Sequence, residues 1–202
     1  MAHSRWIREI VPLGKKRFRV VCESDDSFIL YQGELQTYGI RENAECSAQT
    51  YERLCSEVFR KRAYNRCMYL LEKQDYTEQQ IRQKLEEGLI PAAVIEETVQ
   101  HLKEIRAIDD RRYAQTYLRT NRTRYSARML EQKLLQRGID RELVRQLMEE
   151  DTEMMPDEPQ QIRVLLEKKH YDPVSAEPEE RERMRLALQR KGFSVQLIRK
   201  MT

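Results

Sequence analysis

Arginine and tyrosine side chains are concentrated between positions 117 and 128, in the stretch YLRTNRTRYSAR. This stretch contains four arginines and two tyrosines and no acidic residue. A guanidinium group can bind a phosphate or a carboxylate through two hydrogen bonds, and a tyrosine ring can stack on a nucleobase or fill a pocket in a protein surface. The candidate contact residues for a partner protein or DNA are therefore Arg119, Arg122, Arg124, Arg128, Tyr117 and Tyr125.

The alternative for this stretch is a solvated basic loop that acidic residues elsewhere partly neutralise, and the sequence supports both interpretations equally. Arg128 favours a partner, because it falls in the first turn of a helix that begins at Ser126, where the helix dipole disfavours a cation. Two shorter basic runs, KKR at 15–17 and RKR at 60–62, are weaker candidates, since charge runs are usually solvated faces.

The sequence offers little material for catalysis. It has no glycine-rich phosphate loop, no dinucleotide-binding glycine motif, no HExxH zinc motif and no GxSxG nucleophile motif. The three histidines are scattered, and no two of the four cysteines form a CxxC pair. We therefore expect a protein that is not an enzyme, with reduced and mostly buried thiols and with neither a metal nor a cofactor of its own.

Composition predicts a mainly α-helical chain with an uneven distribution of charge. Charged residues make up 35% of the 202 residues, and there are only six glycines and six prolines. Residues 106–145 hold eleven Arg or Lys against five Asp or Glu, whereas residues 149–158 hold six acids and no base. The basic block is the part expected to meet an acidic partner. Because no apolar run approaches the roughly 20 residues that cross a membrane, and no signal-peptide core is present, we expect a cytoplasmic monomer without membrane contact.

The elements that must position these residues differ between the N-terminal region and the rest of the chain. Two β-prone runs, at 17–21 and 28–31, flank a turn, and Trp6 opens a further strand, so a small antiparallel sheet is expected. From Ser47, a suitable N-cap, the apolar residues fall at helical spacing, and helices are expected to follow, with breaks, to the C-terminus.

An internal repeat determines the expected architecture of the helical part. A helix-start residue and five apolar positions recur in three copies, first after 49 positions and then after 54. The recurring residues are Ile81, Leu85, Ile90, Val94 and Ile95, then Leu130, Leu134, Ile139, Leu143 and Val144, then Met184, Leu188, Phe193, Leu197 and Ile198. Each copy is interpreted as a three-helix repeat with a small interior, so three tandem repeats are expected to form an elongated, curved body.

These patterns divide the chain into five segments. They are a β-hairpin or sheet region at 1–46, a lead helix with the first three-helix repeat at 47–108, the second repeat at 109–150, an acidic hinge at 151–159, and the third repeat at 160–202. Gly138 and Gly192 stand where the second helix of a repeat must end in a left-handed residue. In the first repeat Gly88 comes one position early and Leu89 takes the equivalent place, which leaves the geometry of that turn open.

The stretch IDDRRYAQTYL, at 108–118, places two acids directly before two bases at the start of a helix. Asp109 is suited to the N-cap position, and Asp110 places negative charge in the first turn, where the helix dipole favours it. A structural role is therefore the main explanation for the two acids.

The same stretch resembles the RecX family, whose members regulate the RecA recombinase. The residues that carry the resemblance are Asp109, Asp110, Tyr113 and Ala114, RGI at 137–139 after the helix led by Ser126, YGI at 38–40 and RKGF at 190–193. The likeness extends over nearly the whole chain and implies three tandem three-helix modules behind an N-terminal extension. In that family pattern the four motif residues of the stretch are mainly structural.

The resemblance implies a non-enzymatic regulator that acts in recombination, DNA repair and the SOS response. Such a protein would bind the filament of RecA on DNA, along its helical groove, and would inhibit the ATPase and recombinase activity of RecA without a cofactor of its own.

A second interpretation treats the paired helices as helix-turn-helix units of a nonspecific DNA-binding protein. Segments 94–99 and 143–148 would then be the recognition helices, yet they offer few Asn, Gln or Arg side chains that could read base edges. The expected DNA binding is therefore weak, nonspecific and sensitive to salt.

Overall fold

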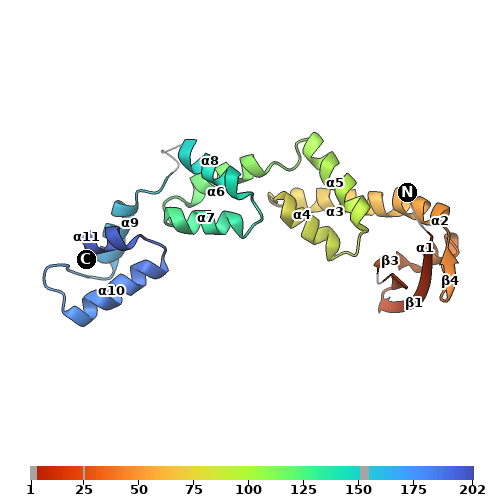
Figure 1. Ribbon diagram of the computed structural model, residues 1–202, viewed down its shortest axis with the longest axis horizontal. Helices are drawn as coiled ribbons and strands as arrows, with labels where there is room; N and C mark the ends of the chain where they lie inside the picture. The colour runs from red at the N-terminus through yellow and green to blue at the C-terminus, as the bar shows by residue number, and fades with distance from the viewer. Residues whose placement is uncertain (1–3, 25, 151–154) are drawn as a thin grey trace. The chain divides into compact units, whose positions relative to one another are not determined.

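The computed structural model describes residues 4–24, 26–150 and 155–202. The chain divides into two compact units, residues 1–109 and residues 110–202. Most of the described residues are helical, and an antiparallel sheet lies near the N-terminus (Figure 1), so the predicted fold class is confirmed.

A four-stranded antiparallel sheet opens the first unit. Its strands lie in the order β3-β2-β1-β4. Phe28 and Leu30 point into the core, whereas Arg19 on the other face is exposed, as the alternation of side chains along a strand requires. The fourth strand was not predicted, because three residues are too few to show a pattern. The strand bounds are β1 (Arg5–Gly14), β2 (Arg17–Cys22), β3 (Ser27–Tyr31) and β4 (Ala44–Cys46).

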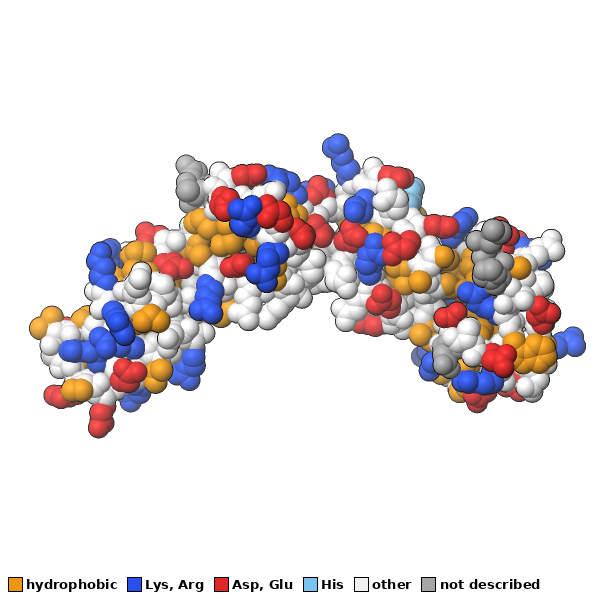
Figure 2. Space-filling model, viewed as in Figure 1, with side chains coloured by type: hydrophobic (Ala, Val, Ile, Leu, Met, Phe, Trp, Pro, Cys, Tyr) orange, Lys and Arg blue, Asp and Glu red, His pale blue; other side chains and the backbone are white. Residues whose placement is uncertain are grey.

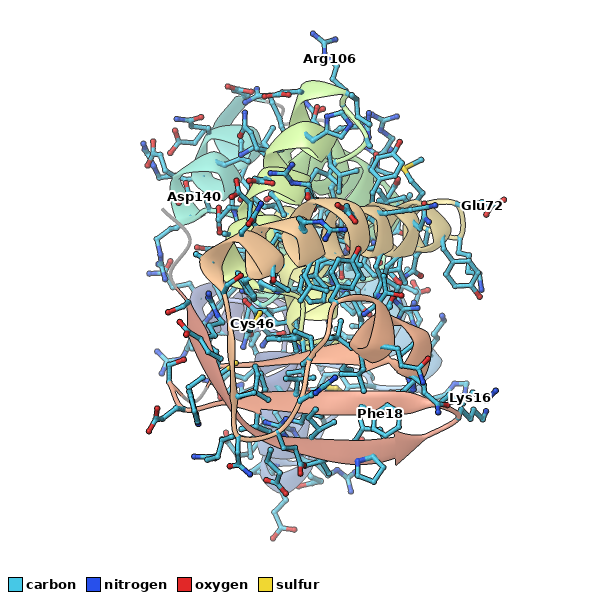
Figure 3. The ribbon with its side chains drawn as sticks, turned by 90° about the vertical axis from the view of Figure 1, so that its right-hand side faces the viewer. Lys16, Phe18, Cys46, Glu72, Arg106 and Asp140 are labelled. Carbon is cyan, nitrogen blue, oxygen red and sulfur yellow. The ribbon has the colours of Figure 1, made fainter. Side chains whose placement is uncertain are left out.

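A long helical run follows the sheet and is fastened to it by Arg62. Ser47 caps its start, since its hydroxyl accepts the amide proton of Thr50 at 3.1 Å. Arg62 donates to the carbonyl of Ile29 at 2.6 Å and to both carboxylate oxygens of Glu34 at 2.8 Å. Figure 3 shows this run beside the sheet, with Cys46 where β4 ends. The run consists of α2 (Ala48–Arg53), the π-helical η1 (Leu54–Phe59) and α3 (Arg60–Leu71). The short helix α1 (Gln32–Thr37), which carries Glu34, lies between β3 and β4.

The first repeat is completed by α4 (Glu78–Glu86) and α5 (Ala92–Glu104). Thr77 and Gln80 form a reciprocal capping box at the start of α4. One hydrophobic cluster includes residues of the sheet, of the long helical run and of the first repeat. The N-terminal sheet and the first repeat therefore share a single core.

The second unit contains six helices among its described residues, with two hydrophobic clusters. One cluster lies among α6, α7 and α8, and the other lies among α9, α10 and α11. Residues of the predicted repeat pattern form both, such as Leu130 and Leu134 in the first and Leu188 and Phe193 in the second. The bounds are α6 (Asp110–Asn121), α7 (Ala127–Leu135), α8 (Arg141–Glu150), α9 (Glu158–Lys168), α10 (Pro178–Arg190) and α11 (Val195–Met201).

The segment predicted as an acidic hinge is described only in part. Its first four residues, 151–154, lie outside the described residues. Met155 packs against the cluster of the second repeat, and Asp157 caps α9 by accepting the amide proton of Gln160 at 3.0 Å. Helix α9 begins at Glu158, so the last two positions of the predicted hinge are helical.

The second helix of each repeat ends in the same way, through a left-handed residue. Gly138 and Gly192 have φ of 80° and 88°, as predicted, and Leu89 has φ of 51°. After Leu89 the amide of Ile90 donates to the carbonyl of Leu85 at 3.1 Å, which is the bond that closes such a helix end. The turn after α4, whose geometry the early position of Gly88 had left undecided, therefore has the same geometry as the turns at Gly138 and Gly192. Leu89 takes the left-handed position there.

Candidate partner-binding surface

The turn between α6 and α7, which carries most of the predicted contact residues, is held against α9. The side-chain amide of Gln161 donates to the backbone carbonyls of Arg122 and of Tyr125, the latter at 3.2 Å. Backbone groups of the turn are thus bonded inward, and its arginine side chains extend into solvent. The third repeat therefore helps to position the basic stretch of the second.

The start of α7 is a second point of contact with the third repeat. Ser126 is fully buried, and its hydroxyl accepts the amide proton of Met129 at 3.3 Å while donating to the carbonyl of Lys191 at 2.9 Å. The carboxylate of Glu158 accepts the amide proton of Ala127 at 2.8 Å, where the helix dipole favours negative charge. Ser126 was predicted as a cap only.

A hollow of about 1140 Å³ opens between this turn, α9 and the turn from α10 to α11. Its apolar lining includes Tyr125, Met129, Met155, Val164, Leu165 and Phe193. The basic residues on it are Arg122, Arg124, Lys168, Arg190 and Lys191. Asp157 is the acidic residue of the lining, and its carboxylate is occupied by the cap of α9. The surface thus combines an apolar floor with cationic side chains.

Three exposed arginines of the basic stretch differ from Arg145 of α8 in their ion pairing. Arg119, Arg124 and Arg128 form no ion pair with any residue that the structure describes. In α8, by contrast, Arg145 pairs with Glu142 at 2.6 Å and with Glu149 at 3.2 Å. Charge without a partner on the chain itself is what a surface for an acidic ligand requires.

In the first repeat, ion pairs neutralise most of the charge on the helix faces. Glu78 is bonded by both Lys103 and Arg82, each at 2.8 Å. Burial by itself would raise the pKa of Glu78, but these two hydrogen bonds outweigh it and lower the pKa below its usual value. Figure 2 shows acidic and basic side chains interspersed over these helices, whereas basic side chains gather over α10. The second unit therefore offers the less neutralised surface.

The two tyrosines predicted as contact residues are less exposed than the arginines of the same stretch. The rings of Tyr113 and Tyr117 are parallel within 6°, with centroids 6.4 Å apart. The guanidinium of Arg137 lies 4.5 Å from the Tyr117 centroid and donates to the Tyr113 hydroxyl at 3.2 Å. Burial raises the pKa of Tyr117. Tyr117 therefore belongs to an internal stack, whereas Tyr125 lines the hollow.

Lys133 and Arg137, which were not among the predicted contact residues, also lie against these tyrosines. The ammonium of Lys133 lies 4.7 Å from the ring centroid of Tyr125, and the guanidinium of Arg124 lies 5.5 Å from it on the same ring. Lys133 lies in the last turn of α7, and Arg137 lies in the turn that follows the helix. Arg137 was noted in the sequence only as part of the RGI stretch of the family pattern. Its spacing of four residues from Lys133 was the one signal that the two side chains could lie on the same side of α7.

The acidic motif lies at the start of α6. This helix begins at Asp110, which places Asp109 at the position predicted for the cap. Ala114 is fully buried in the cluster of the second repeat, and Tyr113 packs against that cluster. These placements agree with a mainly structural role for the motif.

Two other kinds of site are absent from residues 4–24, 26–150 and 155–202. In this part of the chain no helix is both long enough and apolar enough to span a bilayer. The same residues contain no group of three or more His, Cys, Asp or Glu side chains arranged to hold a metal ion.

Comparison with family models places two three-helix domains on the chain. A model described as RecX, first three-helix domain, matches residues 63–102, and a model described as RecX, second three-helix domain, matches residues 109–148. A regulatory protein RecX from Caldanaerobacter subterraneus subsp. tengcongensis is 26% identical over 186 residues, which cover 91% of this chain and 86% of that protein. A regulatory protein RecX from Trichlorobacter lovleyi is 30% identical over 142 residues, covering 68% of this chain and 92% of that protein.

Two solved structures share the fold. A crystal structure of regulatory protein RecX matches with a TM-score of 0.61 at 21% identity, over 98% of each chain. A crystal structure of RecX from Lactobacillus salivarius matches with a TM-score of 0.58 at 21% identity, over 71% of this chain and 94% of that one.

Proposed function

Because this chain belongs to the RecX family of regulatory proteins, we propose that it regulates the RecA recombinase by binding the filament that RecA forms on DNA. In this proposal the bound protein inhibits the ATPase and recombinase activity of RecA, in DNA repair and the SOS response. It acts as a cytoplasmic monomer and by binding alone, with no cofactor, because the hydrolysis of ATP belongs to RecA.

The observation that carries the proposal for a site is the basic rim of the hollow in the second unit, on which Arg124 has no ion pair with a described residue. A RecA–DNA filament presents DNA phosphates and protein carboxylates, and a guanidinium group can bind either through two hydrogen bonds. Arg124 and Arg128 are exposed and form no ion pair with the described residues, so they need not give up an existing partner to bind. The apolar floor of the hollow, which Arg124 also lines, suits a protein surface, since interface cores are apolar and their rims polar.

The test is the ATPase activity of RecA on single-stranded DNA while this protein is titrated in. Wild type is compared with a variant in which Arg119, Arg122, Arg124 and Arg128 are exchanged for alanine. Inhibition by wild type at well below stoichiometric amounts, lost in the variant, is the expected result. A control variant with alanine at Arg41, Lys61 and Arg66, exposed basic residues of the first unit, should inhibit like wild type.

The alternative of a nonspecific DNA-binding helix-turn-helix protein is decided by the same experiment. In that alternative α8 would enter the major groove. Arg145 on α8 is already engaged by Glu142 and Glu149, which weakens this reading. No effect on RecA at equal concentration, at a salt level where the protein still binds bare DNA, would overturn the regulatory proposal and leave DNA binding.

A further inference from the structure

The hairpin between β1 and β2 places two lysines where the backbone favours other residues. Gly14 pairs with Arg17, so the loop between the strands consists of Lys15 and Lys16 alone. Their φ values are 51° and 59°, both left-handed. A two-residue loop with both central residues left-handed favours Asn-Gly, because a β-carbon is disfavoured there. The lysines are therefore not explained by the requirements of the turn.

The tip of this hairpin carries a concentration of positive charge. From Ile10 to Cys22 there is no acidic residue, and the four bases Lys15, Lys16, Arg17 and Arg19 are all exposed. Arg19 donates to the hydroxyl of Ser27 at 3.2 Å, and none of the four has an ion pair with a described residue.

Two carboxylates on neighbouring segments are bonded elsewhere. Glu42 accepts the amide proton of Ile10 at 2.7 Å, and Glu34 pairs with Arg62 at 2.8 Å. The positive charge of the tip is thus left for an external ligand.

The tip is also held in place. The amide of Gln32 donates to the carbonyl of Lys16 at 3.0 Å, which ties the loop to the start of α1. β3 pairs with β2 as far as Arg17, opposite Tyr31, so a third strand supports the hairpin to its end. Figure 3 shows Lys16 at the outer margin of the sheet, at the same end as Phe18. The cations are therefore presented on a supported element, which reduces the ordering needed on binding.

The chemistry of the tip fits nucleic acid better than a protein surface. Lysine is depleted at protein interfaces. Leu13 and Tyr31 are exposed apolar residues beside the tip, but the four exposed cations outnumber them. Contacts to phosphate, in contrast, supply most of nonspecific nucleic-acid binding and need no apolar anchor. We propose that Lys15, Lys16, Arg17 and Arg19 form a contact for the phosphodiester backbone of nucleic acid, on the first unit and separate from the hollow of the second.

The test is a variant that fits the turn better while removing the charge. K15N/K16G supplies the favoured Asn-Gly loop, so its melting temperature should rise. Its affinity for a fluorescein-labelled oligonucleotide, followed by anisotropy in the full chain, should nevertheless fall roughly tenfold or more at moderate salt. The slope of log affinity against log salt should become shallower by about 2, one for each lost phosphate contact.

Matched variants make the outcome decisive. K15R/K16R keeps the charge and should keep both the affinity and the slope. R41Q/K61Q removes two exposed bases of the same unit and should change the slope much less. If K15N/K16G is destabilised, K15Q/K16Q repeats the measurement with ordinary backbone preferences and no charge.

The proposal is overturned if K15N/K16G and K15Q/K16Q bind the oligonucleotide like wild type, or if they lose no more affinity than R41Q/K61Q. Single-stranded and duplex forms of the oligonucleotide show which backbone the tip prefers, and a loss with either form supports the contact. The result does not depend on RecA, because no RecA is present and no residue of the second unit is changed.

Discussion

The hydroxyl of Ser126 donates a hydrogen bond to the backbone carbonyl of Lys191 at 2.9 Å, from the start of α7 to the end of α10. The same hydroxyl accepts the amide proton of Met129, so one buried side chain caps a helix and joins two repeats of the second unit. The candidate hollow lies beside this bond. Its shape therefore depends on a buried residue that joins the two repeats.

Replacement of Ser126 by alanine should destabilise the second unit more than removal of an ordinary cap. We expect a loss of about 2 kcal/mol in the free energy of unfolding, against about 1 kcal/mol for Ser194→Ala. Ser194 is the matched control, because it caps α11 with the same 3.3 Å bond and is exposed. Urea unfolding followed by circular dichroism measures both. Equal losses would show that the bond to Lys191 contributes nothing.

Replacement of Gly192 by alanine should be costly for two reasons. The residue has φ of +88°, and an added β-carbon would lie 2.6 Å from the hydroxyl oxygen of Ser126. Gly39 has φ of +63° with nothing within 4 Å of such a carbon, so Gly39→Ala isolates the backbone penalty, about 1 kcal/mol. Gly192→Ala should lose roughly 2–4 kcal/mol. Because S126A removes the clashing atom, the G192A/S126A double variant should be more stable than the two single losses predict.

A glycine at the end of α9 should stabilise the protein, although glycine is a poor helix residue. His170 is exposed and has φ of 51° at the helix end, which a glycine adopts without strain. We expect His170→Gly to raise the free energy of unfolding by about 0.5–1 kcal/mol, and Lys168→Gly, two positions earlier inside the helix, to lower it by about 1 kcal/mol. Thermal unfolding of the two variants should therefore shift in opposite directions. A decrease for His170→Gly would contradict the explanation from backbone strain.

The repeat and its helix ends could be predicted from sequence because they depend on local patterns. Apolar spacing and a cap residue identified the start of α7, and Gly138 identified its end. The second hydrogen bond of Ser126 could not be predicted, since spacing within one repeat does not show which neighbouring backbone comes close. The sequence also did not show whether Leu89 adopts the left-handed conformation at the end of α4. Its φ of 51° shows that it does.

For the candidate site, the sequence predicted which residues are concentrated there but not how their side chains are arranged. The sequence shows where arginines are concentrated, but the neutralisation of Arg145 by acids in α8, and the lack of described ion pairs at Arg124, require the positions of side chains. Tyr117 was predicted as a contact because it stands beside arginines. Its stack with Tyr113 depends on the helical spacing along α6 and on Arg137 from the turn after α7.

Stability should fall at high pH through two buried thiols. Burial raises the pKa of Cys46 and of Cys67 from 9.0 to about 11. The folded protein thus holds these protons more tightly than the unfolded chain, so their stabilising contribution is complete below pH 9 and is lost as the pH rises towards 11. Unfolding curves across this window should show a smaller fall for C46A/C67A than for wild type. An equal fall in wild type and in C46A/C67A would mean that the thiols do not cause the loss of stability at high pH.

The stack of Tyr113, Tyr117 and Arg137 should stabilise the second unit through the planar guanidinium and not through charge alone. Arg137→Lys keeps the charge but loses the face-on contact with Tyr117 and the bond to the Tyr113 hydroxyl, so we expect a loss of about 1 kcal/mol. Tyr113→Phe removes only the hydroxyl, and the double variant should lose less than the sum, because both changes break one hydrogen bond. Arg141→Lys, an exposed arginine at the start of α8, should leave stability within about 0.5 kcal/mol. If Arg137→Lys kept full stability but weakened inhibition of RecA, Tyr117 and Arg137 would belong to the contact surface and not to the internal support of α6 and α7.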